Sequence, residues 1–260
     1  MLEIKNVTIS YGDRPTVKNF SMDLKKGEIA SIVGESGSGK TTVIRAVLGL
    51  LPGGGKVTEG DILFEGKCLL ENTAEEWRNL RGTDMSMIFQ DSGAMLNPIR
   101  KIGSVFVEYI RTHEKISRKA AWEKGREMLE QMRLPSSDNI MKSYPFQLSG
   151  GMRQRVGIAM AMTFQPKLLL ADEPTSALDV TTQAQIVRQM MELREEWGTS
   201  IIMVTHNLGV AAYMSDQILV MKEGQIADTG SRDQILKGGR SIYTQELLEA
   251  VPSLGGERYV

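Results

Sequence analysis

Thiols and imidazoles are scarce in this sequence, which has one cysteine, Cys68, and two histidines among 260 residues. A single thiol cannot form an intrachain disulfide or supply the four thiolates of an iron–sulfur cluster, and it is compatible with a reducing compartment. We interpret His113 as a surface residue and the 16 methionines as core packing residues, because methionines at helical spacing usually fill gaps. The chain is therefore poorly equipped to bind a transition metal by itself.

The sequence also lacks long apolar runs and an excess of one charge. No stretch approaches the roughly 18 apolar residues of a membrane span, and the start, MLEIKN, has charges of both signs instead of the hydrophobic region of a signal peptide. Any membrane role must therefore come through a partner. Lys and Arg total 31 against 32 Asp and Glu, a net charge of −1, so nucleic-acid wrapping loses its main electrostatic support, although a local basic patch stays open.

The patterns that are present predict an α/β fold. Hydrophobic residues make up 41% of the chain, which is long enough for one large domain or two small ones. Alternation of apolar and polar residues through the first 27 predicts strands with one buried face. Buried strands are expected at 29–33, 167–172, 200–205 and 217–221, hairpin segments at 57–64 and 222–225, and helices at 42–50, 117–133, 149–162 and 185–197.

A glycine-rich segment between a predicted buried strand and a predicted helix carries the first chemical signal. GESGSGKT at residues 34–41, the phosphate loop, fits the pattern GxxxxGK[ST], whose glycines let backbone N–H groups approach phosphate oxygens at a helix N-terminus. Lys40 would reach the β- and γ-phosphates and Thr41 would ligate Mg²⁺. The Lys-Thr ending favours a nucleoside triphosphate over a dinucleotide. The expected nucleotide contacts are Gly34, Ser36, Gly37, Ser38, Gly39, Lys40, Thr41 and Thr42.

Two carboxylates end the apolar run at residues 168–173, LLLADE. Asp172 could hold Mg²⁺, and Glu173, one step further along, could polarise the attacking water. Taken alone, the pair could be a strand that merely ends in acidic residues. The phosphate loop earlier in the chain favours the catalytic interpretation.

The segment LSGGMRQR at residues 148–155 is the most specific. Ser149 is a natural N-cap for a helix that runs to Met162, and Gly150 and Gly151 would allow an anion to approach closely. With the two motifs above, this segment matches the signature sequence of ATP-binding-cassette (ABC) ATPases, a family that the chain resembles over nearly its whole length.

The resemblance implies a P-loop NTPase (RecA-like) α/β core with an N-terminal antiparallel β subdomain and an inserted α-helical subdomain. Residues 1–260 would form a single ABC ATPase domain. Its core and β subdomain would occupy about 1–90 and 163–230, the helical subdomain with the signature about 91–162, and a C-terminal tail about 231–260.

The resemblance also implies roles for single residues. Tyr11 stands where an aromatic ring stacks on adenine, although a strand-end tyrosine packed on a core is the alternative. Gln90 would ligate Mg²⁺ and couple that site to the transmembrane partner, and His206 would contact the γ-phosphate. The loop at 176–179 would cross a dimer interface. Together with Lys40 and Glu173, Gln90 and His206 complete the expected catalytic set.

The family's site is composite, and this implies partners. A second cassette ATPase would supply its own counterpart of Ser149, Gly150 and Gly151 against the γ-phosphate, so that ATP joins the subunits and hydrolysis releases them. By resemblance we expect a heterodimer, with a homodimer left open, together with two transmembrane permease subunits and an extracytoplasmic solute-binding protein. The chain would be a peripheral protein on the cytoplasmic face of the cell membrane, and no nucleic-acid partner is expected.

Further motifs resemble the ATPases of peptide and nickel importers. They include Asn97-Pro98, Tyr144-Pro145 and the tail at 243–252. Longer peptide-branch members add an extension with clustered cysteines, whereas this chain stops at Val260, which favours a short nickel-type member, with a di- or oligopeptide importer as the alternative. The departures from this branch fall at Ser92, Phe146, Asn207 and the pair Ser241-Ile242, and none touches a proposed catalytic group. The cargo therefore stays open.

Two other classes of protein compete with an importer ATPase. A cassette protein acting on DNA or ribosomes usually has long coiled-coil insertions or two cassettes in one chain, and this sequence has neither. A stand-alone P-loop kinase or GTPase would leave the signature segment and His206 unexplained. We therefore expect an ATPase that powers transport through partner permeases.

Overall fold

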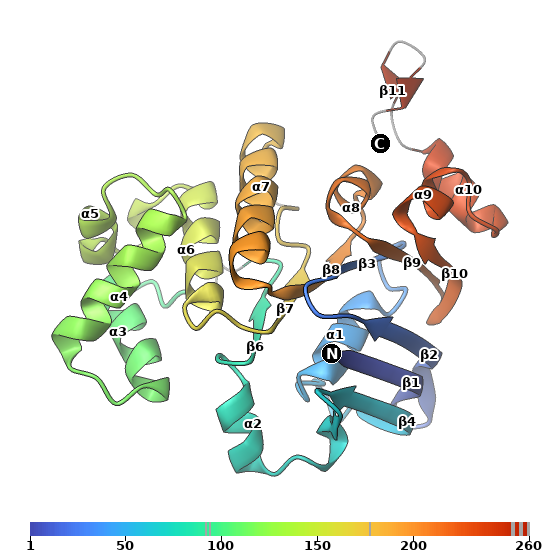
Figure 1. Cartoon of the computed structure of the whole chain (residues 1–260), viewed down its shortest axis with the longest axis horizontal. Helices are drawn as coiled ribbons and strands as arrows, with labels where there is room; N and C mark the ends of the chain where they lie inside the picture. The colour runs from blue at the N-terminus through green and yellow to red at the C-terminus, as the bar shows by residue number, and fades with distance from the viewer. Residues whose placement is uncertain (92, 94, 177, 251–252, 255–256, 259–260) are drawn as a thin grey trace. The chain divides into compact units, whose positions relative to one another are not determined.

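The computed structural model describes the chain except for residues 92, 94, 177, 251–252, 255–256 and 259–260 (Figure 1). Ser92, Ala177 and the pair at 251–252, all used in the sequence argument, lie outside the described residues. The chain divides into two compact units: unit 1 is Met1–Arg78 with Gly198–Val260, and unit 2 is Asn79–Trp197. The subdomain bounds expected from the sequence stay a prediction.

Unit 1 contains an antiparallel sheet with the strand order β2-β1-β4-β5. The expected alternation is confirmed, but its phase changes between the buried residues Ile4 and Val7, where β1 shifts register against both neighbours. Asn6 takes a left-handed φ of 50° at this bulge, and a Cβ on Gly60 of the paired strand would lie 2.2 Å from the Lys5 carbonyl oxygen. The strands are β1 (Leu2–Tyr11), β2 (Arg14–Leu24), β4 (Lys56–Phe64) and β5 (Lys67–Cys68).

Unit 1 also contributes neighbouring strands in the order β10-β9-β3-β8. β3 (Ile29–Val33) runs parallel to β8 (Ser200–Thr205) and β9 (Gln217–Lys222), and every residue of β3 and β8 is buried, as the uncharged runs predict. β9 turns into the antiparallel β10 (Gln225–Ser231) at the expected hairpin. Because Val33 lies opposite Thr205, the segments that follow β3 and β8 leave from the same edge of the sheet.

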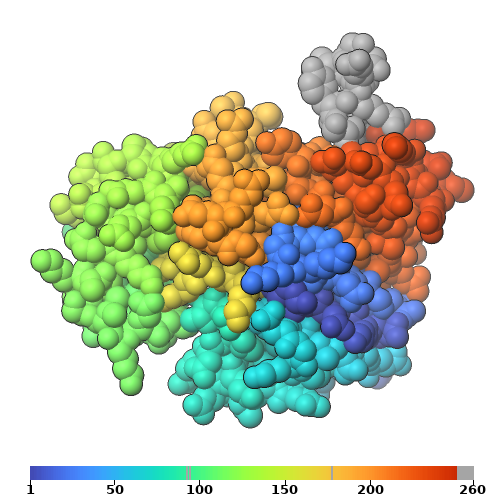
Figure 2. Space-filling model, in the orientation of Figure 1, coloured from blue at the N-terminus to red at the C-terminus, as the bar shows by residue number. Residues whose placement is uncertain are grey.

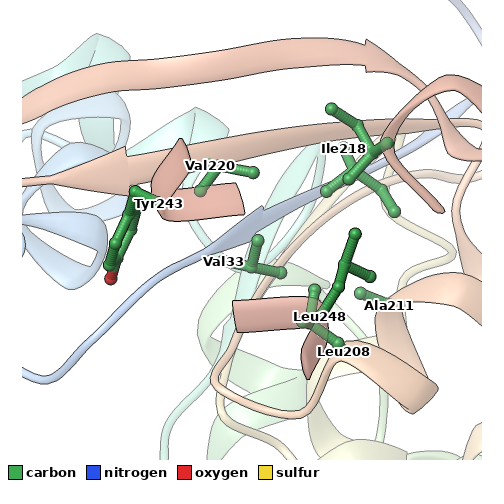
Figure 3. Close-up of a cluster of buried hydrophobic side chains, with 8 residues drawn as sticks. Val33, Leu208, Ala211, Ile218, Val220, Tyr243 and Leu248 are labelled. Atoms are coloured by element: carbon green, nitrogen blue, oxygen red, sulfur yellow. The ribbon is translucent and has the colours of Figure 1, made fainter. Parts of the chain in front are cut away.

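The helices of unit 1 pack an apolar cluster against this sheet. Side chains from β3, β9, α8 and α10 meet in it, among them Val33, Val220 and Tyr243 (Figure 3). In the space-filling view the orange-red to red surface belongs to the segment that follows the buried β9, from β10 to α10 (Figure 2). The elements are α1 (Lys40–Val47), η1 (Leu69–Glu71), α8 (Leu208–Met214), α9 (Arg232–Leu236), α10 (Ile242–Glu249), β11 (Ser253–Leu254) and β12 (Glu257–Arg258), while α2 (Ala74–Leu80) spans the boundary between the units.

Unit 2 combines a parallel strand pair with a group of helices. β6 (Met85–Ile88) pairs with the fully buried β7 (Leu168–Asp172), and Ile88 lies opposite Ala171. Ser117 caps the predicted helix at its N-terminus by accepting a hydrogen bond from the Ala120 N–H at 3.1 Å. The helices are α3 (Ile102–His113), α4 (Arg118–Gln131), α5 (Ser137–Lys142), η2 (Pro145–Gln147), α6 (Gly150–Met162) and α7 (Val180–Trp197).

Some helix bounds and one histidine differ from the expectations. α1 begins at Lys40 instead of residue 42, and α7 begins at Val180 instead of residue 185. His113 is half-buried, with its ring edge-on to Tyr109 at 5.3 Å and Phe164 at 5.2 Å between centroids, so its interpretation as a surface residue is wrong. Burial lowers the pKa of His113. Within the described part of the chain, no helix combines the length and apolarity needed to cross a membrane.

Candidate nucleotide-binding site

The phosphate loop connects β3 to α1 in a backbone path that needs glycine at specific positions. Gly34 has φ 149°, and a Cβ there would lie 2.2 Å from the Met221 carbonyl oxygen. Gly39 has φ 99°, is the N-cap residue of α1, and would place a Cβ 3.0 Å from Val17. A side chain at either position would cause backbone strain or a steric clash. The path of the loop therefore requires glycine at residues 34 and 39.

The side chain of Lys40 folds back into this loop. It is 5% exposed, and its Nζ donates to the Gly34 carbonyl at 2.8 Å, the Glu35 carbonyl at 2.7 Å and Ser38 Oγ at 3.4 Å. Backbone carbonyls therefore satisfy a buried cation at the N-terminus of α1. A positive charge inside a glycine-shaped loop at a helix N-terminus is the arrangement that attracts a polyphosphate.

The other predicted residues of the loop line its path into α1. Ser36 and Gly37 are exposed, Ser38 is buried, and Thr41 and Thr42 are half-buried in the first turn of the helix. The β9–β10 turn supports the loop, because the Gly224 N–H donates to the Ser38 carbonyl at 3.1 Å. The structure therefore places all the predicted phosphate contacts on one continuous segment.

Tyr11 and His206 lie at strand ends of unit 1. Tyr11 ends β1 half-buried, and its ring lies close to Gly55, where an added Cβ would be 2.6 Å from Tyr11 Cε1. His206 is exposed directly after β8, at the edge of the sheet from which the phosphate loop starts. Asn207, one of the departures from the family branch, caps α8 by accepting from the Val210 N–H at 3.2 Å, so this departure keeps the local fold.

The carboxylates and Gln90 come together at the carboxyl edge of β6 and β7 in unit 2. Asp172 is 3% exposed at the end of β7, and Gln90 Nε2 donates to Glu173 Oε2 at 3.3 Å. Glu173 has a left-handed φ of 44°, a conformation that costs energy for a residue other than glycine and is often found at functional sites. The hydrogen bond from Gln90 thus orients the carboxylate of Glu173, the predicted base.

A residue without a predicted role supports this edge. Gln154 of α6 is 5% exposed, and its Nε2 donates to the Pro174 carbonyl at 2.7 Å. The helix of the signature segment therefore contacts the backbone that follows Glu173. The sequence shows only a glutamine within a predicted helix. It does not show that the amide of Gln154 binds the Pro174 carbonyl, twenty residues further along the chain.

Ser149 and the two glycines start α6, as predicted. Ser149 Oγ accepts from the Met152 N–H at 3.3 Å, and Ser149 and Gly150 are exposed. The two glycines differ in their surroundings. A Cβ on Gly150 would meet open space, whereas one on Gly151 would lie 2.9 Å from Thr182 Cγ2 of α7. Gly150 thus leaves the helix N-terminus accessible, and Gly151 lets two helices of unit 2 approach.

Oxygen donors of this kind fit a magnesium ion held mainly by substrate phosphates. Thr41 offers a hydroxyl and Asp172 a buried carboxylate, which are hard ligands suited to Mg²⁺. Among the described residues there is no cluster of three or more His, Cys, Asp and Glu side chains that could form an all-protein metal cage. Each of these two donors, Thr41 in unit 1 and Asp172 in unit 2, is of the type that Mg²⁺ prefers.

Comparisons with known proteins place these motifs in a family. A family model described as ABC transporter matches residues 17–176. The chain is 45% identical to the oligopeptide transport ATP-binding protein OppD of Bacillus subtilis, covering 98% of this chain and 72% of the relative. It is 40% identical to the dipeptide transport ATP-binding protein DppD of Lactococcus lactis, covering 98% and 74%. It is 42% identical to the glutathione import ATP-binding protein GsiA of Escherichia coli, but spans only 42% of that longer protein.

Solved structures agree with the sequence comparisons. A dimeric ATP-binding cassette, MJ0796, in a post-hydrolysis state with ADP and Pi, matches with a TM-score of 0.79 at 30% identity, covering 89% of this chain and 99% of the other. The cbiO1 protein of Clostridium perfringens, part of an ABC transporter complex, matches with a TM-score of 0.78 at 25% identity, covering 91% and 90%. The predicted P-loop NTPase fold is confirmed, and the chain belongs to the ABC transporter family as an ATP-binding ATPase subunit.

Proposed function

We propose that this ATPase powers the import of peptides through partner permeases. The relatives named for oligopeptide, dipeptide and glutathione transport support the peptide alternative over nickel. The scarcity of histidine and cysteine is in keeping with a chain that does not itself hold a metal cargo. In this proposal the cargo contacts other subunits, and this chain supplies the free energy of ATP hydrolysis.

The roles that we propose in nucleotide binding and hydrolysis fall on the residues predicted from the sequence. Residues 34–42 bind the phosphates, Tyr11 stacks on adenine, and the Lys40 ammonium moves from its carbonyl partners to the β- and γ-phosphates.

Thr41, Asp172 and Gln90 would hold Mg²⁺, which when bound neutralises charge on the phosphates. Glu173 polarises water while Gln90 orients its carboxylate, and His206 contacts the γ-phosphate. The buried Lys40 ammonium within the glycine-shaped loop is the observation that carries this proposal.

The exposed start of α6 supports a composite site shared with a second cassette ATPase. Ser149 and Gly150 are exposed at the N-terminus of a helix, where backbone N–H groups favour an anion. We infer that this surface binds the γ-phosphate held by the phosphate loop of a paired ATPase, in a heterodimer by resemblance. Two permeases and a solute-binding protein complete the proposed importer, with this chain peripheral on the cytoplasmic face of the membrane.

Replacing the proposed base tests the chemistry of this site. We expect Glu173→Gln to retain ATP binding, to slow hydrolysis by about 100-fold or more, and to stabilise an ATP-bound dimer, because the amide cannot accept the proton of the attacking water. Nucleotide titration, phosphate release and sedimentation would measure the three quantities. Hydrolysis at the normal rate would show that the base assignment is wrong.

The cargo proposal needs the assembled importer. We would reconstitute the chain with its paired ATPase and permeases in vesicles, add the solute-binding protein, and measure ATP hydrolysis with a mixture of short peptides or with Ni²⁺. Stimulation by peptides and not by the metal is expected. Stimulation by Ni²⁺ alone would contradict the peptide proposal and leave the ATPase assignment intact.

A further inference from the structure

One hydroxyl connects the C-terminal helix α10 to the phosphate loop. The Glu35 backbone N–H donates to Tyr243 Oη at 3.1 Å, although the two residues are 208 positions apart in the chain. Tyr243 is the second residue of α10 and is 7% exposed. This contact lies within unit 1 and has no role in the site described so far.

The peptide group that Tyr243 contacts also holds Lys40. The Glu35 N–H and the Gly34 carbonyl belong to one planar peptide unit, and that carbonyl accepts from Lys40 Nζ at 2.8 Å. The N–H and C=O of a trans peptide point in opposite directions. Tyr243 therefore binds the side of this peptide group that faces away from the Lys40 ammonium. Rotation of this peptide would break both hydrogen bonds, so the hydroxyl sets the orientation of the first peptide of the loop.

The Tyr243 ring is itself firmly placed. It belongs to the apolar cluster with Val33 and Val220, and its oxygen points away from the apolar side chains drawn around it (Figure 3). Lys222 Nζ lies 4.5 Å from the ring centroid, a cation–π contact that also holds the ring. Burial raises the pKa of Tyr243, so the accepting oxygen is that of a neutral phenol at neutral pH.

A buried carboxylate anchors the start of the helix that carries this ring. Asp228 Oδ2 accepts from the Arg240 N–H at 2.6 Å, the Ser241 N–H at 3.0 Å and Thr244 Oγ1 at 3.1 Å. Ser241, one of the departures from the family branch, caps α10 by accepting from the Thr244 N–H. The first turn of α10 is thus fixed on β10, and Tyr243 within it has little freedom to leave the loop.

We propose that Tyr243 is a positioning residue for nucleotide binding, and that the C-terminal segment sets ATP affinity through its hydroxyl. The proposal rests on the phosphate-binding role proposed for residues 34–41. Because the hydroxyl contacts the outer side of the peptide, the bond is retained when a nucleotide occupies the loop. Without it the empty loop gains freedom that the nucleotide must remove, and this weakens binding. The reacting atoms are not touched, so the rate at saturating ATP stays nearly the same.

The test compares Tyr243→Phe with Tyr213→Phe in the full chain. The control removes a hydroxyl from a side chain of α8 that is 60% exposed. We expect Tyr243→Phe to weaken binding of both ATP and ADP by about three- to tenfold, because a part-buried N–H loses its acceptor. The control should bind like the wild type. The KM for ATP should rise by the same factor as the dissociation constant, while kcat stays within about twofold.

Several outcomes would overturn the inference. Unchanged or tighter ATP binding by Tyr243→Phe would do so, as would a fall in kcat with KM unchanged. If the wild type itself fails to bind ATP, the proposed function fails first, so the two failures are distinguishable. Thermal unfolding of each variant would show whether it is folded at the assay temperature.

A second variant keeps the hydroxyl and loosens its support. Asp228→Asn removes the charge that fixes the start of α10, and we expect it to weaken ATP binding by about two- to fivefold. In the Tyr243→Phe background Asp228→Asn should have little further effect on ATP affinity, because the hydroxyl through which Asp228 acts on the loop is already absent. Full additivity of the two losses would overturn the inference.

Discussion

The Lys40 ammonium rests on the carbonyls of Gly34 and Glu35, and a bound triphosphate would compete with those carbonyls for it. We expect Lys40→Ala to weaken ATP binding at least about tenfold, because the cation that balances the β- and γ-phosphates is removed. ADP binding should weaken less, since ADP lacks the γ-phosphate. Titration calorimetry with both nucleotides would measure the difference.

The control for this substitution is Lys26→Ala, which removes the same charge from an exposed position between β2 and β3. It should leave ATP affinity within about twofold, since an exposed charge far from a site is screened by salt. Equal affinities for Lys40→Ala and the wild type would contradict the phosphate-binding role of the loop.

Some residues have roles that the sequence predicts, and others make contacts that it does not predict. Lys40, Asp172 and Glu173 lie within local motifs, so their pattern alone predicted a place in the site. The partners of Gln154 and Tyr243 are backbone groups reached through the tertiary fold, and no local pattern encodes them. The half-buried state of His113 is not predictable for the same reason, because Phe164, one of the two rings beside it, comes from a distant part of the chain, whereas Tyr109 lies one turn earlier in α3.

At the scale of elements, buried strands were the most predictable part of the fold. β3, β7 and β8 are fully buried, and their uncharged runs located them to within a residue. The sequence pattern places the start of α7 five residues too late, because the first turn of the helix has no core-facing pattern: Val180 is 81% exposed. Asp179 accepts from the Thr182 N–H at 2.9 Å, so an aspartate followed by threonines was the capping signal that could have found this start.

The anchor of α10 makes the stability of unit 1 depend on pH. Burial acts to raise the pKa of Asp228, but hydrogen bonds from Arg240, Ser241 and other donors outweigh it and hold the pKa below its usual value. A carboxyl with a lowered pKa contributes stability above its unfolded pKa of about 3.9, and this contribution is lost as the pH falls through the folded pKa. Asp228→Asn should therefore be less stable than the wild type at pH 7, and the difference should shrink below about pH 4.

Urea unfolding of both proteins at neutral and acid pH, followed by circular dichroism, would measure this difference. Asp233→Asn is a suitable control, because Asp233 is exposed in the neighbouring helix α9 and should give a much smaller change at pH 7. Equal stabilities of Asp228→Asn and the wild type at neutral pH would contradict the anchoring role.

For the whole molecule, the order of motifs along the chain was enough to predict the family. The phosphate loop and His206 fall in unit 1, and Gln90, Glu173 and the signature segment fall in unit 2. The phosphate loop and His206 follow parallel strands of unit 1, and Gln90 and Glu173 follow parallel strands of unit 2, as the alternation of strands and helices predicts. What the sequence could not predict is how each group is held, since the Lys40 contacts and the left-handed Glu173 depend on backbone geometry.

The composite site can be tested by a substitution that separates helix capping from phosphate binding. Aspartate is as good an N-cap as serine, and its charge suits a helix N-terminus, so Ser149→Asp should leave thermal stability equal or higher. It should also leave ATP binding to the phosphate loop within about twofold, because in the proposed dimer Ser149 contacts the nucleotide of the partner. At the proposed interface the same carboxylate would face a γ-phosphate, and like charges in a site without water repel strongly.

We therefore expect the Glu173→Gln chain to associate upon addition of ATP, alone or with its paired ATPase, and the double variant Ser149→Asp/Glu173→Gln to stay monomeric under the same conditions. Sedimentation velocity at matched ATP concentrations would distinguish the two. ATP-dependent association that survives the carboxylate would mean that the start of α6 does not meet the nucleotide of a partner. Because the variant is expected to fold and to bind ATP normally, neither misfolding nor an empty phosphate loop could account for a loss of association.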